Sequence, residues 1–424
     1  MFLALLPAFV FSFAFNGFSK IGFENYNNFN KKCYADEITD ALPSDESGET
    51  DESYKAEEPE TASDGEFAEE MRRAIEEFCD QLDLSALDEF YKNYGGAFSS
   101  GDLKQTLLKI ASGEAAFEYS DAFSLIFALS GTSLKALIPI IITVFCIAVF
   151  YGIISSVSNS PRTGSAMFNV CYAAGVGVIF CEMLAVTAQT IGSIKNLCTQ
   201  ADAVFPLLIT LLSLSGGNAA VGFFKPVCVF VAGAGMGLAL NVLTPVAVSV
   251  AAVSGISSFS DKFSLKKFSG FLQSAFKWIL GAVLTVFSFF TAVGGMSAAG
   301  YDGAMMRIFK YTIAGGIPFV GGFAKDSVDV VLTGATLIKN SIGGVVTVCM
   351  FFSMLSSVIK IACFSLCLKL TAAFCEPVSD GRFGEAISAF SKSLSMLAAV
   401  VVYVFIIYFV AMAVLIGAQS AVFA

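Results

Sequence analysis

Long stretches of this chain carry almost no charge, and they constrain its fold more than any other feature. Residues 203–255 contain one charged side chain, Lys225, in 53 positions, and residues 126–424 contain only 16 basic and 9 acidic groups. About 20 consecutive apolar residues are enough for a helix to cross the hydrocarbon core of a bilayer. The sequence therefore predicts an all-α, polytopic integral membrane protein with six to eight spans.

The N-terminal part has the opposite composition. Residues 36–70 hold 15 acidic side chains and one Lys, so the net charge of −10 averages an acidic segment with a weakly basic remainder. With almost nothing to bury, residues 36–70 are expected to form a disordered linker. Residues 1–35 contain an apolar run at 2–15 that is short for a span, and they are predicted to be a signal peptide or an N-terminal anchor, with export of the adjoining acidic segment favoured.

Residues 71–130 are expected to form a small, soluble, extracytoplasmic module of helices. Ser85 followed by Asp88 is a capping-box pattern, and Tyr94-Gly95-Gly96 ends the helix that it starts. The remaining residues, 131–424, are predicted to be the multi-span membrane domain. The helical module is too small to hold a large core alone, so it is expected to pack on a partner or on the membrane domain.

Two apolar stretches of the membrane domain are interrupted by Pro and Gly. The first runs from Pro206 through Gly216-Gly217 to Pro226, and the second contains Pro318 and Gly321-Gly322. Proline and glycine predict broken helices here, and residues 301–341 are expected to be interfacial or re-entrant. In transporters, paired discontinuous helices mark a binding site. Residues 257–278 are amphipathic and predict an interfacial helix on the cytoplasmic side.

Three ionisable side chains lie in or beside predicted spans: Glu182, Lys225 and Lys360. Such groups cost roughly 2.5–3.5 kcal/mol on insertion scales, so each calls for an explanation. Glu182 either lines a proton or ion path, or lies near the surface or against a Lys. The two lysines fit side chains that reach the interface. The G-x-x-x-G spacing of Gly233 and Gly237 fits either packing within the chain or a homo-oligomer interface.

Several chemistries are excluded by composition. The chain has no His, which removes histidine-based acid–base catalysis and His-ligated zinc, and it has no Walker A pattern. No dense basic patch suggests a nucleic acid. We therefore expect a protein that is not an enzyme and that has no catalytic residues, metal site or cofactor.

A combination of motifs resembles the stage III sporulation protein AE family. The hallmark stretch 309–345 carries Lys310, Tyr311, Pro318, Gly321, Gly322, Asp329, Lys339, Asn340 and Gly343. Three further blocks agree in order and spacing, and they contain Tyr94-Gly95-Gly96, then Pro206, Gly216, Gly217 and Pro226, then Pro377 and Asp380. The resemblance runs from about residue 71 to 418. None of these motifs is catalytic.

The resemblance implies a role in endospore formation. It implies a permease-like or scaffold subunit of the channel complex between mother cell and forespore, in the outer forespore membrane, with residues 36–125 in the space between the two membranes. The implied partners are the other stage III sporulation A-operon proteins, including a secretion-type ATPase and a ring-forming subunit, and a forespore membrane protein. The alternative is a stand-alone secondary transporter of a small solute or ion that uses Glu182 and the interrupted segments.

Overall fold

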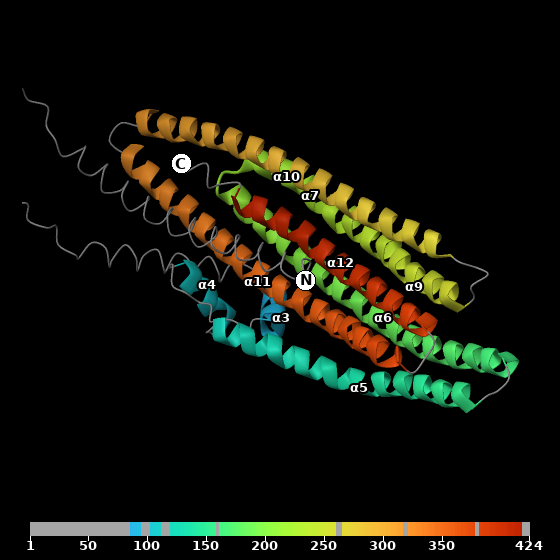
Figure 1. The fold of residues 1–424 in the computed structure, drawn as a ribbon. Helices are drawn as coiled ribbons and strands as arrows, with labels where there is room; N and C mark the ends of the chain where they lie inside the picture. The colour runs from blue at the N-terminus through green and yellow to red at the C-terminus, as the bar shows by residue number, and fades with distance from the viewer. Residues whose placement is uncertain are drawn as a thin grey trace, which may run out of the picture.

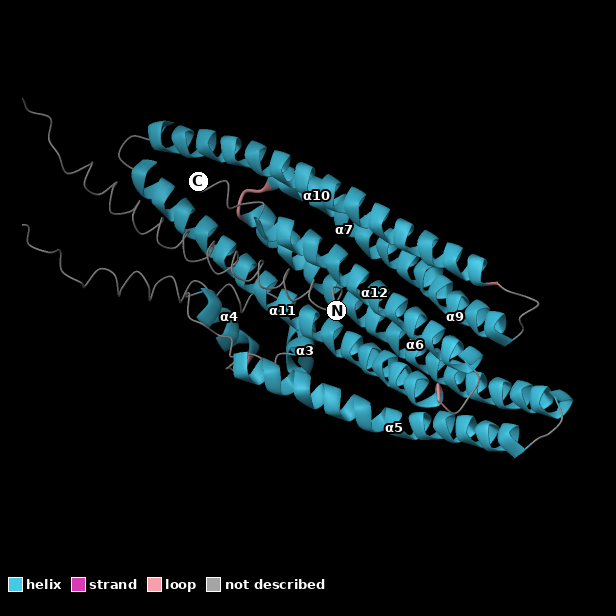
Figure 2. Ribbon diagram, viewed as in Figure 1, coloured by secondary structure: helices cyan, strands magenta, loops and turns pink. Residues whose placement is uncertain are grey.

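The computed structural model describes residues 85–94, 102–111, 119–157, 161–259, 265–316, 321–377 and 381–417. Every regular element in these ranges is helical (Figure 2). Within these ranges, six helical stretches are long and apolar enough to cross a membrane. The all-α, polytopic class is therefore confirmed. The predicted leader, 1–35, and acidic linker, 36–70, lie outside the described residues.

The long helices lie side by side along one axis, and consecutive ones run in opposite directions (Figure 1). Their bounds are α3 Ser85–Tyr94, α4 Leu103–Ala111, α5 Tyr119–Val157, α6 Pro161–Leu214, α7 Asn218–Phe230, α8 Met236–Leu238, α9 Thr244–Phe259, α10 Lys266–Gly316, α11 Gly321–Cys375 and α12 Gly381–Gly417. Two π-helical segments, Val231–Gly235 and Ala239–Leu243, join α7, α8 and α9 into one continuous rod.

Several of these helices are much longer than a bilayer is thick. α6 has 54 residues, α10 has 51 and α11 has 55. At 1.5 Å per residue they extend about 75–85 Å, whereas the hydrocarbon core is about 30 Å thick. Each of these helices therefore continues well outside the membrane that it crosses.

α12 is the central helix of the bundle. It packs against α11, α9, α6 and α10, and most of its side chains from Phe383 to Ile416 are buried. The Tyr408 ring stacks on Phe205 of α6 at 5.8 Å, and Phe405 meets Phe351 of α11 edge-on at 6.0 Å. Apolar residues on every side of α12 explain its position, because a helix without a polar face is stable only when it is surrounded.

The predicted breaks in residues 203–255 are wrong at both prolines that were singled out. Pro206 lies inside α6 and Pro226 inside α7, and both helices continue past them. Proline in a membrane helix is tolerated when neighbouring helices and hydroxyl side chains compensate for the missing hydrogen bond. Only Gly216-Gly217 ends a helix.

Residues 301–341 were expected to be interfacial or re-entrant. α10 continues to Gly316 and α11 starts at Gly321, so an interruption does lie here, at the junction of two long helices. The connection between them, 317–320 with Pro318, lies outside the described residues. The amphipathic stretch expected as a separate interfacial helix is partly the first three turns of α10, which continue directly into a span.

The helices α3 and α4 pack on α11, and α3 also contacts α6. Their buried side chains Leu87, Tyr91, Leu103 and Leu107 belong to the same core cluster as the long helices. The Tyr91 and Thr106 hydroxyl groups share a hydrogen bond of 2.6 Å that joins the two short helices. α5 begins at Tyr119, so the boundary expected at residue 130 falls inside a helix.

Candidate functional site

The turn between α6 and α7 requires glycine at Gly216. Its φ is +89°, a backbone conformation that side chains with a Cβ rarely adopt. The Gly216 N–H donates to the Ser213 carbonyl at 3.1 Å, and the Gly217 N–H donates to the Leu212 carbonyl at 2.9 Å. A Cβ on Gly216 would also overlap the Met306 Cε of α10. The Gly-Gly pair thus closes α6 and lets α10 approach the turn closely.

A buried carboxylate from α10 caps the helix that starts after this turn. Asp302 is 4% exposed, and its two oxygens accept hydrogen bonds of 2.8 Å from the backbone N–H groups of Ala219 and Ala220. These N–H groups are among those that the first turn of α7 leaves without an intrahelical partner. A negative charge at a helix N-terminus is stabilising, and the buried hydrogen bonds strengthen this.

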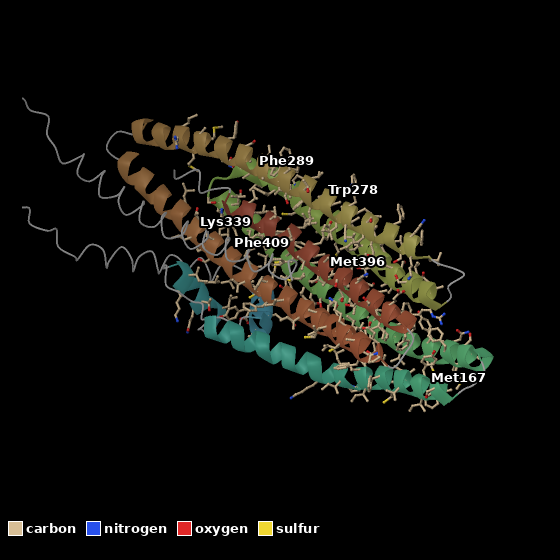
Figure 3. All side chains as sticks on the ribbon, viewed as in Figure 1. Met167, Trp278, Phe289, Lys339, Met396 and Phe409 are labelled. Carbon is tan, nitrogen blue, oxygen red and sulfur yellow. The ribbon has the colours of Figure 1, made fainter. Side chains whose placement is uncertain are left out.

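A buried lysine of α11 contacts the C-terminal end of α12 nearby. Lys339 of α11 is fully buried, and its Nζ lies 3.5 Å from the Leu415 carbonyl in the last turn of α12 (Figure 3). A cation is favourable at a helix C-terminus, where carbonyl groups point outward. One turn further along α11, a Cβ on Gly343 would overlap Ile416, so this glycine allows α11 and α12 to pack closely.

These two caps lie at the same end of the bundle. A Cβ on Gly216 would come within 4.0 Å of the Leu332 side chain, and Lys339 follows Leu332 by two turns of α11. We call this region the Gly216 end, defined by the Gly216-Gly217 turn, Asp302, Lys339 and the end of α12. The polar groups of Asp302 and Lys339 each contact backbone groups at a helix terminus, at the start of α7 and the end of α12 respectively. This arrangement fixes helix ends, and its described side chains include no nucleophile and base in contact.

Most of the family-motif residues of α10 and α11 lie in two places, the Gly216 end and a hairpin beyond it. Lys339, Asn340 and Gly343 lie at the Gly216 end, where the Oδ1 of Asn340 is buried without a hydrogen-bond partner among the described residues. α10 and α11 then continue past the Gly216 end as a helical hairpin (Figure 1). The helices of this α10–α11 hairpin, residues 303–316 and 321–333, carry the other motif positions: Lys310, Tyr311, Gly321, Gly322 and Asp329.

The remaining motif positions are spread over the molecule. Tyr94 is the last residue of α3, and Pro377 is exposed just after α11. Gly95, Gly96 and Asp380 lie outside the described residues. Asp302 was not among the candidate residues identified from the sequence. An acidic residue at the end of a 24-residue uncharged run of α10 was the available signal.

The three ionisable residues singled out in the spans do not come together. Glu182 is half-buried on α6, whereas Lys225 on α7 and Lys360 on α11 are exposed to the outside of the bundle. Among the described residues, none of the three has a hydrogen bond or an ion pair. They therefore do not form a shared polar site in this structure.

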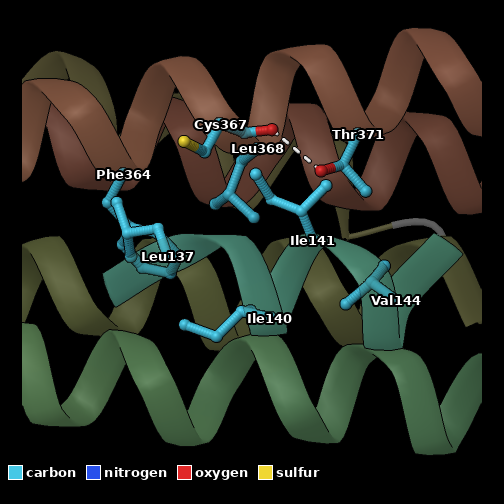
Figure 4. Close-up of a pocket in the computed structure, with 8 residues that line it drawn as sticks. All are labelled: Leu137, Ile140, Ile141, Val144, Phe364, Cys367, Leu368 and Thr371. Atoms are coloured by element: carbon cyan, nitrogen blue, oxygen red, sulfur yellow. Dashed lines mark hydrogen bonds between the residues drawn. The ribbon is translucent and has the colours of Figure 1, made fainter. Parts of the chain in front are cut away.

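The surface offers shallow apolar crevices. One lies between α5 and α11 and is lined by Leu137, Ile140, Ile141, Val144, Phe364, Cys367, Leu368 and Thr371 (Figure 4). The Thr371 hydroxyl there already donates to the Cys367 carbonyl at 2.8 Å. Within the part of the chain that the structure describes, no group of three or more Cys, Asp or Glu side chains is placed to hold a metal ion.

Comparison with known proteins gives the family. The model of the stage III sporulation protein AE family matches residues 101–419. Stage III sporulation protein AE of Bacillus subtilis (strain 168) is 23% identical over 366 residues, which cover 84% of this chain and 90% of that protein. No solved structure matches the chain. With three quarters of its length matched, including the Gly216 end and the α10–α11 hairpin, the chain belongs to the stage III sporulation protein AE family.

Proposed function

We propose that this chain is a non-enzymatic membrane subunit of the channel complex that joins mother cell and forespore during endospore formation. Membership of a stage III sporulation family supports the biological role. The observation that favours a subunit within an assembly is the α10–α11 hairpin. It carries most of the hallmark stretch of the family, it projects beyond the Gly216 end, and buried caps hold its base.

The proposed partners are the other stage III sporulation A-operon proteins, including the secretion-type ATPase and the ring-forming subunit, together with a forespore membrane protein. The proposed location is the mother-cell membrane around the forespore, with the N-terminal region between the two membranes. Helices of about 75–85 Å suit such a role, because they present long protein surfaces outside a bilayer of about 30 Å.

The first experiment deletes the gene in its host and measures a reporter for late forespore transcription. We expect forespore development to stop and to be restored by the wild-type gene. Intact spores and an undiminished reporter in the deletion strain would exclude the proposed role.

The second experiment tests the hairpin as a contact for partners. The pair Lys310→Ala and Tyr311→Ala is compared with Lys267→Ala, which lies at the other end of the same helix α10 and belongs to none of the family motifs. We expect the hairpin variant to accumulate normally in the membrane but to lose co-purification with the A-operon proteins. Equal recovery of these proteins with both variants would argue against the hairpin as the contact.

The transporter alternative depended on Glu182 and on two interrupted spans. Both interruptions lie at the junctions of long helices, so neither is a break within one continuous helix. Glu182→Gln separates the two functions, because it removes the ionisable group and keeps the shape. A scaffold tolerates this change with normal spore counts, whereas an ion path through Glu182 does not.

A further inference from the structure

The bundle has two opposite edges that both expose apolar side chains. α5 forms one edge, with α3 and α4 beside it, and α10 forms the other (Figure 1). On α5 the uncharged stretch is 136–157, and on α10 it is 278–301. Contacts between neighbouring helices show at what height along the bundle each stretch lies, which decides whether one bilayer can cover both.

Contacts across the bundle place Ile147 of α5 level with about Ser269 of α10. A Cβ on Gly175 of α6 would lie 3.8 Å from Ile147, a Cβ on Gly255 of α9 would lie 3.5 Å from Val176 of α6, and the Ser254 and Ser269 hydroxyl groups share a hydrogen bond of 2.7 Å. At this level the α5 edge is apolar, since Phe150 is 58% exposed. The α10 edge at the same level has the exposed lysines Lys266, Lys267 and, two turns on, Lys277.

Closer to the Gly216 end of the bundle, at the level of α3, the α10 edge is apolar and the opposite edge is polar. Tyr91 of α3 lies close to Cys349 of α11, Phe351 packs on Phe405 of α12 at 6.0 Å, and Val414 packs where a Cβ on Gly295 would lie. Because Phe405 precedes Val414 by nine residues in a helix parallel to α10, it is level with about Val286. Here the α10 edge is apolar, with Phe289 71% exposed.

The α3–α4 edge at that level is polar. Its exposed side chains include Glu89, Lys92 and Asp102. A bilayer perpendicular to the bundle axis at this height would surround these charged groups with lipid. A perpendicular bilayer at the height of Phe150 would instead surround the lysines at the start of α10. Neither height suits both edges.

We propose that the bilayer crosses the bundle obliquely, so that its hydrocarbon layer contacts α5 low on one edge and α10 high on the other. The centres of the two uncharged stretches differ by about 20 residues, or about 30 Å along the axis. Three steps between helix axes, from α5 through α6 and α9 to α10, add up to about 27 Å. These two lengths give a tilt of about 48°, steeper than the usual range of about 0–40° for membrane helices.

The α10 stretch covers most of the hydrocarbon layer at this tilt. Its 24 residues extend about 36 Å, which at 48° covers about 24 Å of depth, against a hydrocarbon thickness of about 30 Å. The oblique layer includes Glu182 on α6 and Lys360 on α11. A perpendicular layer on the α10 side would include the charged outer face of α3 and α4 as a whole and would leave the apolar face of α5 in water.

The single tryptophan of the chain makes a depth measurement practical. Trp278 is 79% exposed, directly after Lys277, and the oblique layer places it at the lower interface. In a Trp278→Phe background, one variant carries Phe150→Trp and the other Phe289→Trp. Both are conservative changes at exposed positions that lie about 35 Å apart along the bundle axis. The full chain is reconstituted in phosphatidylcholine vesicles with bromine at defined positions along the acyl chain.

We expect both new tryptophans to be quenched more by bromine near the acyl-chain ends than by bromine near the glycerol, and native Trp278 to show the reverse order. If Phe289→Trp is deep and Phe150→Trp is quenched by aqueous iodide, the bilayer is perpendicular and the proposal is wrong. If Phe150→Trp is protected from lipid bromine and from iodide, protein covers the α5 edge, which also overturns it. Circular dichroism and size exclusion check that each variant is folded.

Discussion

Replacing Gly216 by Ala tests whether the Gly216 end is held as described. Two costs add at this position. The backbone has φ of +89°, and a non-glycine residue in such a conformation costs about 1–3 kcal/mol. The new Cβ would also overlap Met306 Cε, and overpacking of a core costs about 1–3 kcal/mol. Because the end of a Met side chain is flexible, we expect a total near the lower part of the sum, about 2–4 kcal/mol.

The matched control is Gly222→Ala, nearby on α7. Gly222 lies in the helix and a Cβ there has nothing within 4 Å, so alanine should leave stability unchanged or raise it by about 0.5–1 kcal/mol. The double variant Gly216→Ala with Met306→Ala removes the overlap, keeps the backbone cost and loses the packing of Met306. It should therefore remain less stable than the wild type.

Stability is measured as resistance to thermal unfolding in detergent, with the monodisperse fraction followed by size-exclusion chromatography. We expect Gly216→Ala to unfold at a clearly lower temperature than wild type and Gly222→Ala to unfold at or above it. Equal unfolding temperatures for the two variants would refute the assignment of Gly216 as the residue that closes α6.

Three further changes probe the packing. Asp302→Ala leaves two N–H groups of α7 without their buried acceptor and should lower the free energy of unfolding by about 2–4 kcal/mol. Asp302→Asn keeps one acceptor and should lower it by about half as much in the same thermal assay. Gly343→Ala should destabilise the protein by about 1–3 kcal/mol, because the new Cβ overlaps Ile416. The control Gly334→Ala on the same helix should not destabilise it, because a Cβ there has nothing within 4 Å. Equal effects of the two changes would count against close packing of α11 on α12. Burial raises the pKa of Tyr91, against the opposing effect of its hydrogen bond to Thr106, so folding favours the neutral phenol. Docking of α3 should therefore be unchanged below about pH 10 and weaken above it, and limited proteolysis should show that Tyr91→Phe, although weaker at neutral pH by about 1 kcal/mol, lacks this alkaline loss.

The glycines of the spans show what local sequence can and cannot predict about packing. Small residues allow helices to approach closely, but in the structure only some of these glycines lie against a neighbouring helix. Gly175 lies under Phe383, and Gly294 lies under Phe223, so these two allow packing within the chain. A Cβ on Gly233 would meet nothing within 4 Å, so the first glycine of the G-x-x-x-G pair has an open outer side. Spacing alone does not tell which face of a helix is covered.

The sequence by itself determined the class of protein and the set of motifs. Charge-poor runs of 20 residues or more are sufficient for that, because hydrocarbon accepts only helices with satisfied backbones in such a chain. The break predicted in residues 301–341 is found between Gly316 of α10 and Gly321 of α11. The same local information failed at Pro206 and Pro226, where proline predicted breaks within helices that continue. Their cost is a few kcal/mol at most, and packing against several neighbouring helices outweighs it.

Only the tertiary structure decided where the motifs lie relative to one another. It brought Asp302 to the start of α7 and Lys339 to the end of α12, contacts that join positions 82–83 and 76 residues apart in the chain. It also showed Lys225 and Lys360 on the outside of the bundle. Helical periodicity fixes which residues share a face, but the partner of that face depends on how distant helices pack, and no local pattern encodes it.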